Sequence, residues 1–315
     1  MIESDKKEKG VPMSKFLVAG ILQRETIIKV NELPIKYQPV TDNLQSIHSS
    51  IGGDAYNEAI ALKWLGNSVD FFSLIGTDDP PSIINPQSSD IHIDTDFILP
   101  IASDTPAAVI FCDKTRKQQI FEDIKDLRDC EYDLKPFLDE LPTADMVVFS
   151  NANFCRPLLQ AAVNGGKKIA LNIRNFKHET ECYNRFFLEN ADILYLSDDN
   201  LDEDPYDFLK YMVSEYHPDV VILGQGADGV IIYSSKTDTY AHFNSVKTNE
   251  IVNTVGAGNA LFSCFLHYYN KSGDPVYSIR NALLFASYKI GFIGTSIGFM
   301  TEKQIEDWRE LIWKN

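Results

Sequence analysis

The sequence predicts an α/β fold: a doubly wound, mostly parallel sheet flanked by helices, with a smaller β-sheet projecting from it. After Leu141, short apolar runs alternate with helical stretches, as in strands joined by crossover helices. Before Leu141, several runs alternate apolar and polar residues, as strands do when one face is wet. Such half-exposed strands do not fit inside a parallel sheet covered on both faces, so we assign them to the smaller sheet.

The composition is that of an ordinary globular protein with one large domain. The chain has 315 residues, of which 44% are hydrophobic, enough to bury a large core. Its formal net charge of −16 repels nucleic-acid phosphates and anionic lipid, and no cluster of Lys and Arg opposes that balance. We therefore expect no nucleic acid and no membrane among its partners.

The first half of the chain supplies buried strands and the strands of the smaller sheet. Residues 1–14 are polar and are expected to form a disordered tail before a domain spanning 15–315. "FLVAGIL" and "VDFFSLIG" suit buried strands. The alternating segments "TIIKVNELPIKYQPV", "AAVIFCD" and "KQQIFED" predict the smaller sheet, at about residues 27–40 and 97–123. "GGDAYNEAIALKWLG" predicts a helix with Asp54 as its cap and Gly66 as its stop.

The second half alternates strands and helices. "DMVVFS", "KIALNI", "DILYLS" and "DVVILG" read as strands, and "RPLLQAAVNG", "YNRFFLENA" and "DFLKYMVSEY" as helices. "GQGADG", from Gly224 to Gly229, matches the GxGxxG dinucleotide pattern, but that pattern needs a helix after it. The β-branched "VIIYSS" follows instead, so a hairpin turn is favoured.

The cysteines and the N-terminus indicate a cytoplasmic protein. Five cysteines are scattered without CxxC or Cys/His spacing typical of zinc, which fits a reducing compartment. The sequence has neither an apolar run of about 18 residues nor the apolar core of a signal peptide at its start.

Two glycine-containing helix starts are candidate binding sites. In "SIGGDAYNEA", Gly52 and Gly53 would let a ligand touch the backbone, while Asp54 and Asn57, three residues apart on one helical face, would bind its hydroxyls. An ordinary tight turn with an Asp cap explains the same residues. "NTVGAGNALF" opens an apolar helix that must be buried, and its bared N–H groups suit an anion, although small residues also serve close packing.

Together and in this order, these segments resemble the PfkB family of carbohydrate kinases, which has the ribokinase-like fold. "GGDAYNEAIALKWLG" is similar to the family's N-terminal signature, and "NTVGAGNALFSCFL" to its C-terminal one, commonly DTxGAGD before an apolar helix. The resemblance implies that the smaller sheet is a lid, which in the family often joins two subunits into a homodimer. It implies ATP and Mg²⁺ as cofactors and a small sugar or nucleoside as the phosphate acceptor.

The resemblance also assigns residues to three parts of a site. The sugar-binding positions are Glu25, Gly52, Gly53, Asp54 and Asn57. The anion hole for the transferring phosphate is formed by Gly256, Ala257 and Gly258. The nucleotide positions are Ser197, Asn200, Gly224, Gly226, Gly229 and Thr254, and no residue is assigned to a metal.

Several polar positions of the family pattern carry neutral residues here. The catalytic aspartate that ends DTxGAGD is Asn259, and the aspartate that opens it is Asn253. The NxxE motif aligns with "SDDN", which puts Ser197 and Asn200 at its ends, and the aspartate after the middle strand is Asn172. Asparagine keeps the shape of aspartate and caps a helix about as well, but it cannot accept a proton.

These departures leave three hypotheses. The first is a kinase-family protein that binds a small polyol or nucleoside and whose phosphoryl transfer is weak or lost, because Asn259 replaces the base. The second is a fully active sugar kinase whose base is another carboxylate, with Asp54 and Glu25 as the nearest candidates. The third is a non-catalytic, small-ligand-binding dimer.

Overall fold

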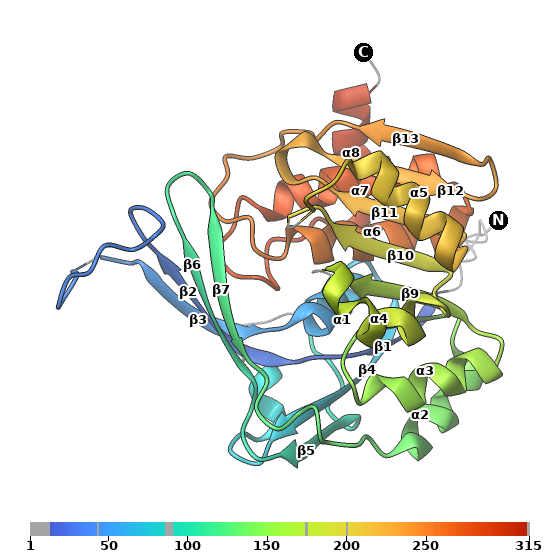
Figure 1. The fold of residues 1–315 in the computed structure, drawn as a ribbon, viewed down its shortest axis with the longest axis horizontal. Helices are drawn as coiled ribbons and strands as arrows, with labels where there is room; N and C mark the ends of the chain where they lie inside the picture. Colours follow the sequence, from blue (N-terminus) through green and yellow to red (C-terminus); the bar gives the residue numbers. More distant parts are fainter. Residues whose placement is uncertain (1–12, 43, 86–90, 174–175, 200, 314–315) are drawn as a thin grey trace, which may run out of the picture.

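A nine-stranded sheet forms the centre of the fold (Figure 1). The structure is a computed structural model that describes residues 13–42, 44–85, 91–173, 176–199 and 201–313, so most of the predicted tail lies outside the described residues. The strands in spatial order are β13 (Thr239–Phe243), β12 (Val230–Ser234), β11 (Val220–Gly224), β10 (Ile193–Ser197), β9 (Lys168–Ile173), β8 (Met146–Ser150), β1 (Lys15–Ala19), β4 (Ser68–Gly76) and β5 (Ile98–Ala102).

The sheet is doubly wound, as the sequence predicts. From β1 the chain moves outward to β4 and β5, and then returns to β8 on the other side of β1. All neighbouring strands from β5 to β11 are parallel, and only β12 and β13 add as antiparallel strands at the far edge. The antiparallel pairing of β11 with β12 confirms the hairpin that "GQGADG" predicts.

Helices cover both faces of this sheet. One face packs against the apolar sides of α1 (Asp54–Trp64), α6 (Ala257–Ser272), α7 (Pro275–Lys289) and α8 (Glu302–Trp313). The other face packs against α2 (Leu134–Glu140), α3 (Cys155–Asn164), α4 (Glu181–Leu188) and α5 (Pro205–Tyr216). In the described residues, no helix is both long and apolar enough to cross a bilayer.

Local signals in the sequence explain where helices start and stop. Asp204 caps α5 by accepting from the backbone N–H groups of Tyr206 and Asp207, and a proline follows it at the first helical position. Asp274 and Pro275 repeat this arrangement at α7. Helix α6 ends at Gly273, which has the left-handed conformation that glycine adopts without strain.

A four-stranded sheet projects from the main body in Figure 1. Its order is β3 (Ile47–Gly52), β2 (Gln23–Lys29), β6 (Ala107–Cys112) and β7 (Gln118–Asp123). A small apolar cluster of Ile27, Ile110 and Val255 joins its inner face to the loop before α6. The sheet therefore stands directly over the start of α6.

The strands of this sheet differ from the predicted range in three respects. Strand β2 ends at Lys29, although the alternating pattern runs on to residue 40. Strand β3 was not expected, because "IHSSIG" carries polar residues on both faces. Strand β5 lies in the large sheet, paired with β4, and not in the smaller one. Strand β5 forms one edge of the large sheet. Its Pro100 has no backbone N–H to donate, which an edge strand tolerates because it has a neighbouring strand on one side only.

Candidate functional site

The first turns of α1 and α6 meet at the end of β9 and are joined by a chain of hydrogen bonds. Asn259 Nδ2 donates to Asp54 Oδ1 at 3.1 Å. Asn172 Nδ2 donates to Asn259 Oδ1 at 3.2 Å and to Glu58 Oε1 at 2.6 Å. Three positions that the sequence singled out are thus brought together with Glu58, which sequence reasoning missed.

Glu58 is a carboxyl group enclosed in the core. Its side chain is fully buried, and burial raises its pKa well above the usual range, with the charge of Asp54 acting in the same direction. Its Oε2 atom has no hydrogen-bond partner among the described residues. Burial therefore favours the uncharged form of Glu58. The sequence did contain one signal for Glu58: it follows Asp54 by four residues, which places both carboxyl groups on one face of the helix.

Glu25 ties three segments together at the base of the small sheet. Its Oε1 accepts from Gly53 N at 2.9 Å and from Gln23 Nε2 at 3.1 Å, and its Oε2 accepts from Thr295 Oγ1 at 2.7 Å. A Cβ atom at Gly52 would lie 2.2 Å from the carboxyl carbon, so only glycine fits there. Both carboxylate oxygens are engaged by protein groups, and they hold the start of α1 in place.

Asn57 is another polar side chain of α1 with an unpartnered atom. It is 3% exposed, and its Oδ1 has no hydrogen-bond partner among the described residues. A buried acceptor of this kind is costly unless something binds it. Asn57 is therefore suited to accept a hydrogen bond from a ligand hydroxyl.

The loop before α6 has a shape that requires its glycines. Gly256 has φ 79°, a left-handed conformation, and no side chain in the described residues caps the helix that follows. A Cβ atom at Gly258 would lie 2.5 Å from the Tyr195 hydroxyl oxygen, and one at Gly224 would lie 2.6 Å from the same atom. Tyr195 thus lies between two loops: the loop before α6 that contains Gly256, which we call the anion loop, and the loop that begins at Gly224, which was expected to bind the nucleotide.

Tyr195 is a second residue that sequence reasoning missed. It lies on β10, is 6% exposed, and its ring packs at a tilt on Phe262 with a centroid distance of 5.5 Å. The signal was weak, because a tyrosine inside the apolar run "DILYLS" reads as an ordinary core residue.

The expected nucleotide positions are only partly described. Ser197 ends β10 and its Oγ accepts from Asp199 N at 3.4 Å, while Asn200 lies outside the described residues. Asp198 accepts from Gln225 Nε2 at 3.3 Å, and burial raises the pKa of its carboxyl. The glycines Gly226 and Gly229 both have positive φ, at 55° and 100°.

Two hydrogen bonds join the small sheet to the anion loop, in addition to the apolar cluster at Val255. Gln118 Nε2, at the start of β7, donates a short hydrogen bond to Thr254 Oγ1. Cys112 Sγ donates to Asn253 Oδ1 at 3.9 Å, and that oxygen also accepts from Val255 N at 3.1 Å. The sheet is therefore closed over the loop in this structure.

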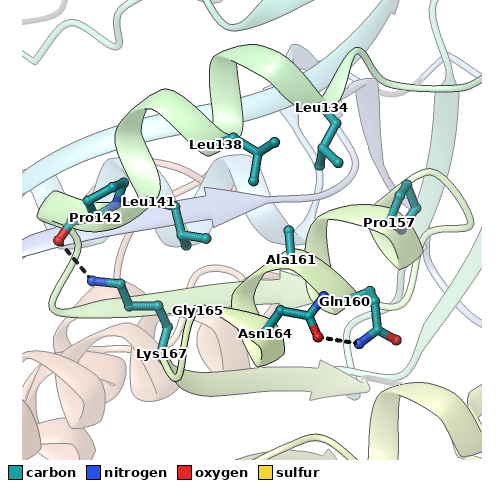
Figure 2. Close-up of a pocket in the computed structure, with 10 residues that line it drawn as sticks. All are labelled: Leu134, Leu138, Leu141, Pro142, Pro157, Gln160, Ala161, Asn164, Gly165 and Lys167. Atoms are coloured by element: carbon teal, nitrogen blue, oxygen red, sulfur yellow. Dashed lines mark hydrogen bonds between the residues drawn. The ribbon is translucent and has the colours of Figure 1, made fainter.

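A separate hollow lies away from this site, between α2 and α3 (Figure 2). Leu134, Leu138 and Leu141 face Ala161 across it, and Lys167 closes one end with a 3.0 Å bond to the carbonyl of Pro142. None of the predicted site residues lines it.

Comparison with known proteins gives a consistent family. The model of the pfkB family of carbohydrate kinases matches residues 13–302. A deoxyribokinase of Salmonella typhi is 31% identical over 91 residues, so the match spans only 29% of this chain and 29% of that protein. An ATP-dependent 6-phosphofructokinase of Thermoanaerobacterium thermosaccharolyticum is 24% identical over 78% of this chain and 80% of its own length.

The fold likeness covers nearly the whole chain. The structure of Arabidopsis thaliana ribokinase, complexed with ribose and ATP, superposes with a TM-score of 0.74 at 15% identity, over 94% of this chain and 98% of that one. At this identity the likeness shows the fold alone.

The close approach of Gly258 to Tyr195 gives a stability prediction. We expect Gly258→Ala to cost about 1–3 kcal/mol of unfolding free energy, because its methyl group would strike the tyrosine hydroxyl. Adding Tyr195→Phe removes the struck atom, so the double variant should regain most of the loss. Urea unfolding of both single variants and the double variant measures the coupling, and additive losses would contradict the contact.

Proposed function

This chain belongs to the pfkB family of carbohydrate kinases, and on that basis we propose that it binds a small sugar or nucleoside together with ATP but transfers phosphate weakly or not at all. The observation that carries the proposal is the side chain of Asn259. It is buried, and its amide bonds on both sides, to Asp54 and to Asn172. An amide in this position holds its neighbours but takes no proton.

The start of α1 is the proposed acceptor site. Asp54 and the unpartnered Oδ1 of Asn57 supply acceptors for ligand hydroxyls. Gly52 and Gly53 allow the protein itself to pack closely there, because a Cβ atom would lie 2.2 Å from Glu25 at the first and 2.5 Å from the carbonyl oxygen of Ile21 at the second. Glu25 supports this site by fixing the backbone of Gly53. This carboxylate-rich lining favours a neutral polyol over an anionic one.

The start of α6 is the proposed phosphate site. Its first N–H groups carry no side-chain cap in the described residues, which fits an anion at Gly256, Ala257 and Gly258. ATP, when bound, supplies the phosphoryl group and leaves as ADP. The described part of the chain offers no group of three His, Cys, Asp or Glu that could hold a metal, so we assign no ligand to Mg²⁺.

A second candidate function is an active kinase with Asp54 as its base. The observation in its favour is the 3.1 Å bond between Asp54 Oδ1 and Asn259 Nδ2, which puts a carboxylate next to the family's base position. The acceptor's hydroxyl proton would pass to Asp54, and general-base catalysis of this kind typically contributes ~10²–10⁴-fold.

We also propose that the small sheet is a lid that pairs with a second copy of the chain. Its outer face carries a strip of apolar side chains that cross-strand pairing brings together, namely Ile28, Ile47, Val109, Phe111 and Phe121. Ile47 is 67% exposed and Phe121 is 57% exposed. A sheet of this size does not normally leave one apolar face in water.

Ligand binding is tested by thermal unfolding with ribose, deoxyribose, fructose and inosine, each with and without ATP and Mg²⁺. A ligand at 100 times its Kd should stabilise the native state by about 2.7 kcal/mol, because it binds only that state. Asp54→Ala should remove this protection. Asp139→Ala, which deletes an exposed carboxylate on α2, should retain it. Full protection of Asp54→Ala would show that the acceptor site lies elsewhere.

Catalysis is tested by exchanging the two side chains at the base position. Asn259→Asp alone places a second carboxylate against Asp54, so repulsion should raise the pKa of one of them and blunt any gain. The double variant Asp54→Asn/Asn259→Asp keeps the hydrogen bond in the opposite direction, because the amide at position 54 then donates to the carboxylate at position 259. We expect its transfer from radiolabelled ATP to exceed the wild-type rate by ~10²-fold or more.

The same assay separates the two candidate functions. Wild-type turnover of roughly 1–100 per second, lost in Asp54→Asn, would establish the active kinase and overturn weak transfer. A double variant that binds both ligands but stays at the background rate would show that Asn259 is not the main defect.

Lid pairing predicts a dimer in solution. Light scattering should give twice the chain mass of 35.6 kDa, and Phe121→Asp should shift the protein toward monomer by placing a charge in the apolar strip. Asp123→Asn, an exposed change on the same strand, is the control. A monomeric wild type would contradict the pairing.

A further inference from the structure

Lys289, the last residue of α7, carries an amino group buried beneath the anion loop. Its side chain is 0% exposed. The Nζ atom donates a short hydrogen bond to the carbonyl of Val255, just before Gly256, and a 2.8 Å bond to the carbonyl of Gly294, in the segment after α7. One side chain therefore joins the two backbone segments that meet behind the start of α6.

The position is close to the proposed phosphate site. A Cβ atom at Gly256 would lie 3.3 Å from Lys289 Nζ and 2.8 Å from the carbonyl oxygen of Thr295. Gly256 is the N-cap of α6, whose N-terminal dipole is positive. The ammonium group of Lys289 thus lies next to Gly256, at the positive end of the α6 dipole.

Burying an ammonium group is expensive, so its presence calls for a reason. Burial lowers the pKa of Lys289 to about 7, and the nearby charge of Glu25 opposes the shift. Burial also raises the pKa of the Cys112 thiol, which therefore remains protonated near neutral pH. Glu25, on β2, is then the anionic group that faces the ammonium.

We propose that Lys289 is a built-in cation of the phosphate site: it positions the anion loop through two carbonyl bonds and strengthens phosphate binding with its charge. This inference rests on the proposed phosphate site and adds a positioning residue to it. Tethered to α7, the charge is present without any added ion. Lys289 itself does not touch the ligand, since the loop lies between them.

The proposal has a definite pH dependence. Below about pH 7 Lys289 is charged, and above it the group becomes a neutral amine, so phosphate affinity should fall as pH rises through 7. The stability of the unliganded protein should respond in the opposite direction. An unfolded lysine keeps its proton up to pH ~10.4, so this group makes the fold more stable as pH rises from 7 toward 10.

Sulfate is a suitable probe, because its charge is constant over this range, whereas ATP itself titrates. At constant ionic strength, we expect the Kd of wild-type protein for sulfate to rise by about tenfold between pH 6 and pH 8, following the loss of the charged form. Lys289→Met should bind sulfate weakly, with a Kd that no longer changes with pH.

Lys236→Met is the matched control. The Lys236 ammonium also donates to a backbone carbonyl, that of Gly273 at 2.9 Å, but at the opposite end of α6. This variant should keep the wild-type pH profile. If Lys289→Met does not fold, the comparison of the wild-type and Lys236→Met profiles carries the test.

The outcomes are distinct. Sulfate binding that is equally tight at pH 6 and pH 8 in wild type would overturn the role of Lys289 and leave the phosphate site standing. No sulfate binding at any pH would contradict the site and the inference together. A pH profile that persists unchanged in a folded Lys289→Met protein would assign the titration to another group and would also overturn the inference.

Discussion

Helix α6 is buried along most of its length, and that burial determines where its first residues lie. Every residue from Asn259 to Tyr269 is buried, so the helix has no face to turn to solvent. Its position between the sheet and α7 is therefore fixed by the apolar core. The N–H groups of its first turn, which no side chain caps in the described residues, must then emerge at the edge of the sheet where α1 also begins. The candidate site is a consequence of this packing.

The charges around that point are unusual for a protein interior. Glu58 is a buried carboxyl group beside Asp54, and Glu25 is a second buried carboxyl group, which Lys289 faces from α7. Each is held differently: Glu25 by three donors, and Glu58 by Asn172 as its one side-chain donor among the described residues. The amides of Asn172 and Asn259 donate to Glu58 and to Asp54 respectively, and they link these two carboxyl groups. Replacing either amide with a carboxylate would add a like charge to a crowded pocket.

Much of the fold could be predicted, because its signals are local. The strands β8 to β11 are short apolar runs between helical stretches, and they form where the sequence indicates. Strand β3 could not be predicted, since its polar residues become a strand only when β2 lies beside them. Strand β5 has the composition of either sheet, and only tertiary pairing with β4 decides between them.

The site was predictable where a motif marks it and not where contacts are long-range. The glycines of both helix starts and Asn259 stand in recognisable sequence patterns. Tyr195 and Lys289 reach the site from positions that carry no motif, and Glu58 lies within the first glycine-containing segment without being one of its pattern residues. The roles of these residues depend on which atoms the fold brings near them. Lys289 in particular ends an ordinary apolar helix, where a basic residue usually caps the helix dipole in solvent.

The order of strands in the small sheet has a consequence for how the protein folds. Strand β2 pairs with β6, which is separated from it in the chain by α1, β4 and β5. The two halves of the small sheet can meet only after those elements have brought their ends together, so its closure carries a large loop entropy and comes late. Its apolar attachment to the loop before α6 is one small cluster, and a region with few buried apolar contacts opens at a lower free energy than the core. The loop before α6 would then be uncovered while the large sheet stays intact.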